Sequence, residues 1–448
     1  MTQTQSGNVD SPAQAVDSAS PDSAQPFPDA RASDPMAIGW MLGAPPPPEK
    51  IIRFQDGSYW RFPMFRWSFS HWRELVPTVN VPRGPASTCE LTRALRGELD
   101  ALTFTPLGGA RKMTWADSLY ANYTDGIIVL HSGRIVYERY FGALSAERPH
   151  IAFSVTKSFF GTLATSLILE GKLDPLAPVA RYLPELTHSG FADASVAQVL
   201  DMTTALNFDE HYDNPAATFH EYGRAVGYEP RPASYAGPLT DYGYLASVRK
   251  AGEHGESFVY RSVNTDVLAW LIARVTAQAS HEVLRDRIWT RLGMEHDAYI
   301  QVDSIGTPLA SGGLNTRLRD LARFGEMIRQ GGVCRGEQIL PAAAIAEIRR
   351  GGNRQAFAGA GYHTLPGWSY HNQWWVSHDD HGTFMGRGIH GQALYIDPKA
   401  EMVIARFASH PLAANINLDP TSLPAYRAVA DHLIAHPHQS KGLAGLPV

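Results

Sequence analysis

Residues 150–164, HIAFSVTKSFFGTLA, place a serine and a lysine three positions apart in a stretch that is otherwise mostly apolar. In a helix, residues i and i+3 lie on the same face, so Lys157 can reach the hydroxyl of Ser154. Ser154 would stand at the helix N-terminus, where free N–H groups and the helix dipole favour developing negative charge. The pattern predicts a nucleophilic serine with a lysine beside it.

Three phenylalanines surround this pair: Phe153, Phe159 and Phe160. Apolar surroundings remove water from an ammonium group, which favours the neutral form of Lys157 and makes it a usable base. A serine N-cap followed by a solvated lysine would give the same pattern, because S-x-x-K occurs often by chance. Other motifs in the chain must therefore support the catalytic interpretation.

The composition of the chain restricts its class of partner. Its 448 residues suffice for one large domain or two interleaved subdomains. The 39 basic and 44 acidic residues give a formal charge of −5 without long runs, which argues against nucleic acid or an anionic membrane as partner. The sequence contains no run of about twenty apolar residues, so no membrane span is predicted. A small-molecule substrate is the remaining expectation.

The two cysteines, Cys89 and Cys334, lie far apart in the sequence and lack metal-ligand spacing. This arrangement supports neither a disulfide framework nor a zinc site, so we expect buried or free thiols. No metal or cofactor is expected from the sequence.

The N-terminal region divides into two expected parts. Residues 1–35 are rich in Ser, Asp, Pro, Gln and Ala and lack the basic and apolar regions of a secretory signal. They predict a disordered leader and a cytoplasmic protein. Residues 36–100 are dense in aromatic side chains and are expected to pack as an arm on the main body. An aromatic surface of this kind would also suit a homodimer.

Residues 101–440 have the pattern of an α+β enzyme. Strand pairs are predicted at 125–142, around a turn at 131–134, and at 392–409. Apolar residues at helical spacing predict helices at 154–170, 195–206, 264–278 and 316–332. The sequence thus predicts an antiparallel sheet built from both chain ends and flanked by helices, with a helical subdomain inserted at roughly 172–310.

Two further motifs follow the S-x-x-K pair. In GESFVYRSVNTDVLAWL, Tyr260 ends a short extended segment before a helix, so its phenol can project from a loop edge. In GRGIHGQALYIDP, Gly386, Gly388 and Gly391 stand at the entry to the last strand pair, where a backbone can approach a ligand closely.

With these motifs, the chain resembles serine hydrolases of the β-lactamase and penicillin-binding-protein fold, which use S-x-x-K, a tyrosine motif and a strand in place of K-T-G. Within that fold it is most similar to the 6-aminohexanoate-dimer hydrolases, amidases that act on nylon oligomers and also cleave esters. The resemblance runs from about residue 66 to residue 409, and SVTKS, FVYRSVNTDVLAW and GIHGQ are its strongest stretches. It implies a β-lactamase/transpeptidase-like fold.

The resemblance also implies roles for the motif residues. Ser154 would be the nucleophile, with Lys157 and Tyr260 as a coupled proton-transfer pair. A tyrosine near an ammonium group can have a lowered pKa, so either residue could be the immediate base. The oxyanion would be held by the backbone N–H groups of Ser154 and Ile389.

Further positions of the family would contact substrate. Tyr212 matches a tyrosine that closes over the bound amide, Trp375 a pocket-wall indole, and Ser311 a residue lining the site. A surface-loop tyrosine, a core tryptophan and an ordinary Ser-Gly-Gly turn are the alternatives for these three residues.

The position that holds the substrate amine is less well defined, because the segment between Tyr212 and Tyr260 is longer than the resemblance predicts. Either Glu221 or Gly223 could occupy it. Glu221 in the pocket would favour a cationic amino substrate, whereas Gly223 would favour a generic esterase. His390, beside Ile389, could contact substrate or be a hydrogen-bonded structural histidine.

Three functions are consistent with these residues. The first is a serine hydrolase that cleaves short linear amides or carboxylic esters through an acyl-enzyme. The second is a β-lactamase or D-alanyl-D-alanine peptidase, which is disfavoured because GRGIH offers no lysine for a substrate carboxylate. The third is a binding protein without activity, which is disfavoured by the presence of Ser154, Lys157 and Tyr260 together.

Overall fold

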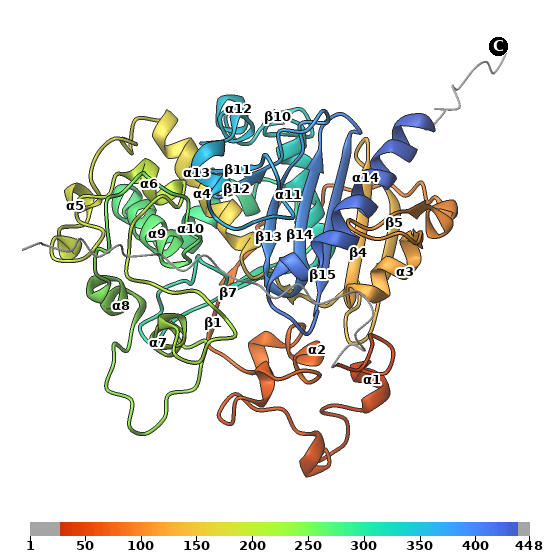
Figure 1. The fold of residues 1–448 in the computed structure, drawn as a ribbon, viewed down its shortest axis with the longest axis horizontal. Coiled ribbons are helices and arrows are strands. Elements are labelled where there is room, and N and C mark those ends of the chain that lie inside the picture. The colour runs from red at the N-terminus through yellow and green to blue at the C-terminus, as the bar shows by residue number, and fades with distance from the viewer. Residues whose placement is uncertain (1–26, 438–448) are drawn as a thin grey trace, which may run out of the picture.

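The computed structural model describes residues 27–437 (Figure 1). Of the leader expected at 1–35, residues 1–26 lie outside the described residues. Residues 27–35 are folded, which corrects that expectation. The carboxylate of Asp34 caps helix α1 (Pro35–Ile38), and the Ser33 hydroxyl accepts a hydrogen bond of 2.9 Å from the Arg66 guanidinium.

Helices and strands occur in separate runs along the rest of the chain. The remaining helices are α2 (Phe65–Ser68), α3 (Trp115–Ala121), α4 (Val155–Leu169), α5 (Val179–Tyr182), α6 (Val196–Leu200), α7 (Thr218–Val226), α8 (Asp241–Ser247), α9 (Val263–Thr276), α10 (Ser280–Leu284), α11 (Leu318–Arg329), α12 (Ala342–Arg350), α13 (Arg354–Ala358) and α14 (Asp419–Ala435). The strands are β1 (Thr78–Val81), β2 (Thr103–Phe104), β3 (Met113–Thr114), β4 (Thr124–His131), β5 (Arg134–Tyr140), β6 (His150–Ile151), β7 (Ala298–Gln301), β8 (Leu314–Thr316), β9 (Val333–Cys334), β10 (Glu337–Gln338), β11 (Ser369–His371), β12 (Trp374–Val376), β13 (Phe384–Gly388), β14 (Gln392–Asp397) and β15 (Met402–Ala408).

A seven-stranded antiparallel sheet joins the two ends of the chain. Its strand order is β11-β12-β13-β14-β15-β4-β5, and β15 pairs with β4 so that Ile404 lies opposite Val129. Both predicted hairpins are present, as β4–β5 and β14–β15. The fold class expected from the sequence is therefore confirmed.

The two faces of this sheet are covered by different helices. Successive side chains of a strand point to opposite faces. Ile128 and Leu130 accordingly belong to the core formed with α4 and α11, while Ile127 and Val129 belong to the core formed with α3 and α14. In Figure 1, α14 crosses in front of the sheet, and α4 lies beside the helical region.

The helical region between α4 and β7 differs in detail from the expected subdomain at 172–310. Its helices run from α5 to α10, whereas β7 already belongs to a four-stranded sheet of order β1-β7-β8-β6. The helix expected at 195–206 is only α6, because Met202 adopts a left-handed φ of 52° that a helix cannot contain. The longer helix α9 packs against α4.

The N-terminal arm surrounds the residue that precedes the S-x-x-K serine. Within it, β1 pairs with β7, and Trp60 and Phe69 make edge-to-face contacts with Phe153 at centroid distances of 5.5 and 4.8 Å. Such pairs add packing energy beyond the area they bury. The arm therefore forms one wall around the start of α4.

Two other observations concern the whole of residues 27–437. In this part of the chain, no helix combines the length and apolar character needed to cross a membrane. Cys89 and Cys334 are both free and partly buried, and their sulfur atoms lie 3.7 Å apart. Their separation in the sequence gave no indication of this proximity.

Close packing of α4 on the sheet predicts that Gly161→Ala destabilises the fold. A methyl group at this position would lie 2.2 Å from the carbonyl oxygen of Asn372 and 2.5 Å from Cβ of Gln373. Because a backbone atom must move, we expect the free energy of unfolding to fall by about 3 kcal/mol or more. Urea unfolding measures the change.

The control is Gly359→Ala, where an added methyl group meets nothing within 4 Å. Its unfolding midpoint should change little. An unchanged midpoint in Gly161→Ala would show that α4 and the loop at Asn372 are not packed as described.

Candidate active site

The chain enters α4 through a strained residue. Strand β6 pairs with β8, and Phe153 then takes a left-handed φ of 42° before Ser154, the N-cap residue of α4. A phenylalanine in this region is held there only by its surroundings. Aromatic contacts with Trp60 and Phe69 of the arm hold Phe153 in this conformation. Ser154, the next residue, then lines a small cavity.

Ser154 and Lys157 are in direct contact. The Lys157 ammonium donates to the Ser154 hydroxyl at 3.0 Å and to the carbonyl oxygen of Ser311. Lys157 is only 1% exposed. Burial lowers its pKa to about 8, although the carboxylates of Glu210 and Asp266 act in the opposite direction. At pH 7 roughly one molecule in ten therefore carries a neutral lysine.

Tyr260 completes the group. It lies just before α9, and the Lys157 ammonium is 5.3 Å from the centre of its ring. Burial raises the pKa of Tyr260 well above its usual value, and the charge of Glu210 adds to this effect. A hydrogen bond with Ser154 lowers the pKa, but only in part. The lowered tyrosine pKa expected from the sequence is therefore wrong, because desolvation and the charge of Glu210 outweigh the hydrogen bond with Ser154.

A buried network supports Lys157 from the other side. Asp266 on α9 is 1% exposed and accepts hydrogen bonds from the Tyr222 hydroxyl at 2.6 Å and from the Ser311 N–H at 2.9 Å. Burial raises the pKa of Asp266 to about 6, while the Tyr222 hydrogen bond and the charge of Lys157 oppose the shift. The network fixes the Ser311 carbonyl that accepts from Lys157.

The end of strand β13 lies against the backbone of Ser154. A methyl group on Gly388 would lie 2.8 Å from the Ala152 carbonyl oxygen and 3.1 Å from the Ser154 nitrogen, so only glycine allows this approach. Ile389, the next residue, lines the cavity. Within residues 27–437, no group accepts a hydrogen bond from the Ser154 N–H. This N–H is available to an oxyanion.

The cavity beside Ser154 is lined mainly by aromatic and acidic residues of six separate segments: Trp60, Phe153, Ser154, Glu210, Tyr212, Phe219, Tyr222, Tyr228, Glu229, Ser262, Ser311, Gly312 and Ile389. Two of the residues expected to contact substrate, Tyr212 and Ser311, are among them. The Tyr212 hydroxyl donates to Glu210 at 2.7 Å, and the Ser311 hydroxyl shares a hydrogen bond of 2.7 Å with Tyr222.

Two other expected contacts lie behind the cavity wall. Trp375 on β12 is buried and packs parallel to the Tyr260 ring at 5.7 Å, so it supports the tyrosine. His390 is buried among aromatic side chains, and its Nδ1 is 2.7 Å from the carbonyl oxygen of His410. Burial lowers the pKa of His390 to about 4, as in a neutral structural histidine.

Neither expected amine-binding residue presents a carboxylate to the cavity. Glu221 is exposed on α7, and Gly223 is buried with its α-carbon facing the side chain of Glu229. Glu229 and Glu210 line the cavity instead. These acids could not be identified from the sequence, because the loops that carry them have no motif and only the fold brings them to Ser154.

The two cavity acids differ in how far they are already paired. Glu210 accepts from the Ser262 N–H and from the hydroxyls of Ser262 and Tyr212, at 2.5 to 2.7 Å. Glu229 contacts Nδ1 of His220 at 2.6 Å and the guanidinium of Arg224 at 3.8 Å. Glu210 thus holds the site together, and Glu229 has the greater capacity to accept a further donor.

Comparisons with known proteins agree with this geometry. The family model described as Beta-lactamase matches residues 117–416. The chain is 36% identical over 356 residues to the 6-aminohexanoate-dimer hydrolase of Paenarthrobacter ureafaciens, covering 79% of this chain and 88% of that protein. A Bacillus anthracis structure described as a candidate 6-aminohexanoate-dimer hydrolase superposes with a TM-score of 0.78 at 33% identity, covering 85% of this chain and 97% of that one.

A more distant structure shows the fold alone. EstCE1, described as a hydrolase with promiscuous acyltransferase activity, matches with a TM-score of 0.53 at 17% identity, covering 70% of this chain and 98% of its own. With the family model spanning most of the chain and the S-x-x-K pair in contact, the protein belongs to the β-lactamase family and is a serine hydrolase of that fold.

Proposed function

We propose that this hydrolase cleaves short linear amides that carry a free amine, together with simple carboxylic esters, through an acyl-enzyme on Ser154. The contact of 3.0 Å between the Lys157 ammonium and the Ser154 hydroxyl, in a site that excludes water from the lysine, is the observation that carries the proposal. The name of the Paenarthrobacter ureafaciens relative supports a 6-aminohexanoate dimer as substrate.

Neutral Lys157 is the base in this mechanism. It takes the proton of the Ser154 hydroxyl as the oxygen attacks the substrate carbonyl carbon. The oxygen of that carbonyl becomes an oxyanion, which accepts hydrogen bonds from the backbone N–H groups of Ser154 and Ile389. Lys157 suits this role because its lowered pKa leaves a neutral fraction near pH 7.

Tyr260 delivers a proton to the leaving group. Its raised pKa keeps the phenol protonated, so it acts as a donor beside Ser154. Lys157 replaces the proton that Tyr260 gives up, and the amine or alcohol departs. Water then attacks the acyl-enzyme, with the same two residues moving its proton in reverse, and releases the carboxylic acid.

The surroundings of β13 favour this function over a β-lactamase or D-alanyl-D-alanine peptidase. The basic residue of GRGIH, Arg387, is buried, donates to the Asp419 carboxylate at 2.5 Å and stacks over Trp375. It does not line the cavity beside Ser154. A binding protein without activity is excluded by the family and by the assembled Ser154–Lys157 pair.

Glu229 is the residue that we propose as the substrate's amine anchor. It lines the cavity, and its contact of 3.8 Å with Arg224 leaves room for a closer cation. This assignment takes the place of the choice between Glu221 and Gly223.

The cytoplasmic location and the homodimer expected from the sequence stay predictions, which cell fractionation and light scattering would test.

The central prediction concerns Ser154→Ala. We expect this variant to lose turnover of p-nitrophenyl butyrate and of the linear 6-aminohexanoate dimer by about 10⁴-fold or more, because no other group can form the acyl-enzyme. Initial rates on purified protein measure both. Ser158→Ala is the matched control, since Ser158 lies one turn along α4 and donates to the Gln373 carbonyl oxygen.

The outcomes of this experiment separate the alternatives. Loss of both activities in Ser154→Ala alone would support the mechanism. Ester turnover without dimer cleavage in the unaltered protein would indicate a generic esterase. Activity that survives in Ser154→Ala would overturn the assignment of the nucleophile.

Protonation of Lys157 predicts a pH dependence. The neutral fraction of a lysine increases as pH rises through its pKa, so kcat/KM for the ester should rise with an apparent pKa near 8 and level off above it. In Asp266→Asn the negative charge that favours the ammonium is absent, and this limb should move to lower pH.

The control is Asp320→Asn, which alters another buried carboxyl with a pKa raised to about 6 that does not act on Lys157. Its pH profile should match that of the unaltered protein. An unmoved limb in Asp266→Asn would contradict the role of Lys157 as base.

Substrate selectivity should depend on Glu229. We expect Glu229→Gln to lower kcat/KM for the 6-aminohexanoate dimer by roughly 10- to 100-fold, the value of a hydrogen bond to a charged group, while hydrolysis of neutral p-nitrophenyl butyrate is retained. The exposed Glu221→Gln should affect neither substrate. Equal losses on both substrates in Glu229→Gln would show that Glu229 has only a structural role.

A further inference from the structure

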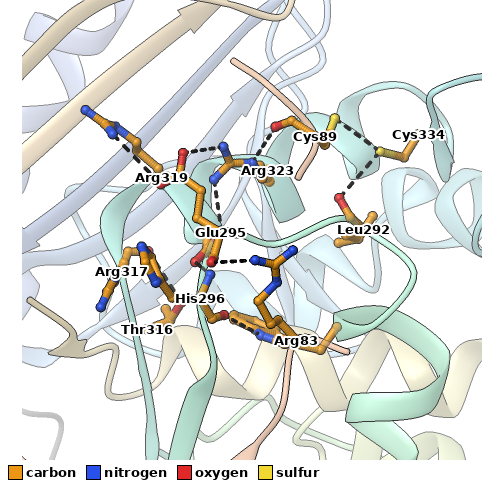
Figure 2. Close-up of polar contacts among 12 residues, drawn as sticks. Arg83, Cys89, Leu292, Glu295, His296, Thr316, Arg317, Arg319, Arg323 and Cys334 are labelled. Carbon is orange, nitrogen blue, oxygen red and sulfur yellow. Dashed lines mark hydrogen bonds and ion pairs between the residues drawn. The ribbon is translucent and has the colours of Figure 1, made fainter. Parts of the chain in front are cut away.

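Cys89 of the N-terminal arm and Cys334 of the β9–β10 hairpin are in contact through their sulfur atoms (Figure 2). Cys89 lies after β1, and Cys334 ends β9. Their sulfur atoms are 3.7 Å apart, within hydrogen-bond distance, whereas a disulfide needs about 2.05 Å. The two thiols are 245 positions apart in the chain, so the fold alone brings them together.

Both cysteines are held by contacts to the rest of the molecule. The Cys89 N–H donates to the Gly293 carbonyl oxygen at 2.7 Å, and the Cys89 carbonyl oxygen accepts from Nε of Arg323 at 2.8 Å. Arg323 is itself buried and paired with Asp320 at 3.0 Å and with Glu295 at 2.7 Å. Figure 2 shows this guanidinium between Glu295 and Cys89.

The segment that carries Cys334 is joined to the arm directly. Arg335, the next residue, donates to the carbonyl oxygen of Ser87 at 3.0 Å and to its hydroxyl at 3.1 Å. The thiol of Cys334 also faces the Leu292 carbonyl oxygen at 3.9 Å. The two backbone segments are therefore held side by side before any bond forms.

The charges around the pair make one thiol the better nucleophile. A hydrogen bond from Cys334 lowers the pKa of Cys89, burial opposes this, and the guanidinium groups of Arg323 and Arg335 lower it further. The same contact raises the pKa of Cys334. A thiolate is the attacking species in thiol–disulfide exchange, and partial exposure of Cys89 lets a small reagent reach it.

We propose that Cys89 and Cys334 are a dithiol oxidation site that closes reversibly to an intramolecular disulfide and fastens the arm to the β9–β10 hairpin. The oxidant is a low-molecular-weight disulfide of the glutathione type. The Cys89 thiolate attacks one of its sulfur atoms and expels a thiolate. Cys334 then loses its proton to solvent, attacks the Cys89 sulfur and expels the second thiol. Two protein thiols are oxidised, and one small disulfide is reduced to two thiols.

The disulfide should stabilise the protein without altering catalysis. Neither cysteine lines the cavity at Ser154. A bond that closes so long a loop restricts the unfolded chain, so the thermal unfolding midpoint should rise by several degrees. This site is independent of the substrate proposed above.

The test uses the full chain incubated with glutathione disulfide at pH 8, with free thiols then blocked by N-ethylmaleimide. Mass spectrometry of a digest made without reductant should show one linked species containing Cys89 and Cys334, lighter than the two peptides by two hydrogen atoms. Dithiothreitol should remove the link and the rise in unfolding midpoint.

Single variants test the order of the steps. Cys334→Ser should accumulate a glutathione adduct on Cys89, because the resolving thiol is absent, and should do so faster than Cys89→Ser modifies Cys334. Neither variant should gain thermal stability from the oxidant. Stable adducts on both cysteines of the unaltered chain, a disulfide between two chains, or thiols that stay fully alkylated would each overturn the proposal. Ester turnover by the oxidised and reduced forms should be equal.

Discussion

Burial of one ammonium group beside one hydroxyl is the constraint on which the rest of this structure depends. An ammonium taken out of water is strongly destabilising unless partners compensate for its lost solvation, or unless it gives up its proton. Lys157 has partial compensation only: one carbonyl oxygen, one hydroxyl and two carboxylates that act through space. The remaining cost appears as a lowered pKa, which is the property that a lysine base requires. Stability and chemistry are therefore coupled at a single residue.

The sheet determines where that residue meets its partners. Pairing of β15 with β4 joins the two chain ends, and β13, which pairs with β14, brings Gly388 against the backbone of Ser154. Helix α4 is pressed against the same sheet at Gly161, where there is no space for a methyl group. Helix α4, which begins directly after Ser154, and strand β13, which ends directly before Ile389, thus meet at the same sheet. An oxyanion site needs its donors in place before charge develops.

Local patterns account for the parts of this arrangement that the sequence could predict. The Ser154–Lys157 contact follows from helix periodicity, and the first hairpin follows from β-branched and aromatic residues on both sides of a turn. The cavity acid Glu229 and the buried Asp266 have no local signal, since their neighbours are distant in sequence. The predicted direction of the Tyr260 pKa shift was wrong for a related reason. A nearby ammonium can be inferred from a motif, but the extent of burial depends on the whole fold.

The pairing of Glu229 before any substrate arrives limits how selective the site can be. Its carboxylate already contacts the His220 ring at 2.6 Å and the Arg224 guanidinium at 3.8 Å, so an ammonium that binds Glu229 competes with these two partners. The net binding free energy gained by a cationic substrate is the difference between Glu229 paired with the substrate ammonium and Glu229 paired with its protein partners. This difference is smaller than the attraction of an unpaired carboxylate for an ammonium. A neutral ester lacks only this net gain in binding free energy. In the proposed mechanism, every substrate uses the same serine, lysine and oxyanion donors. With Glu229 as the proposed amine anchor, selectivity for a cationic substrate over a neutral ester is therefore smaller than an unpaired carboxylate would give.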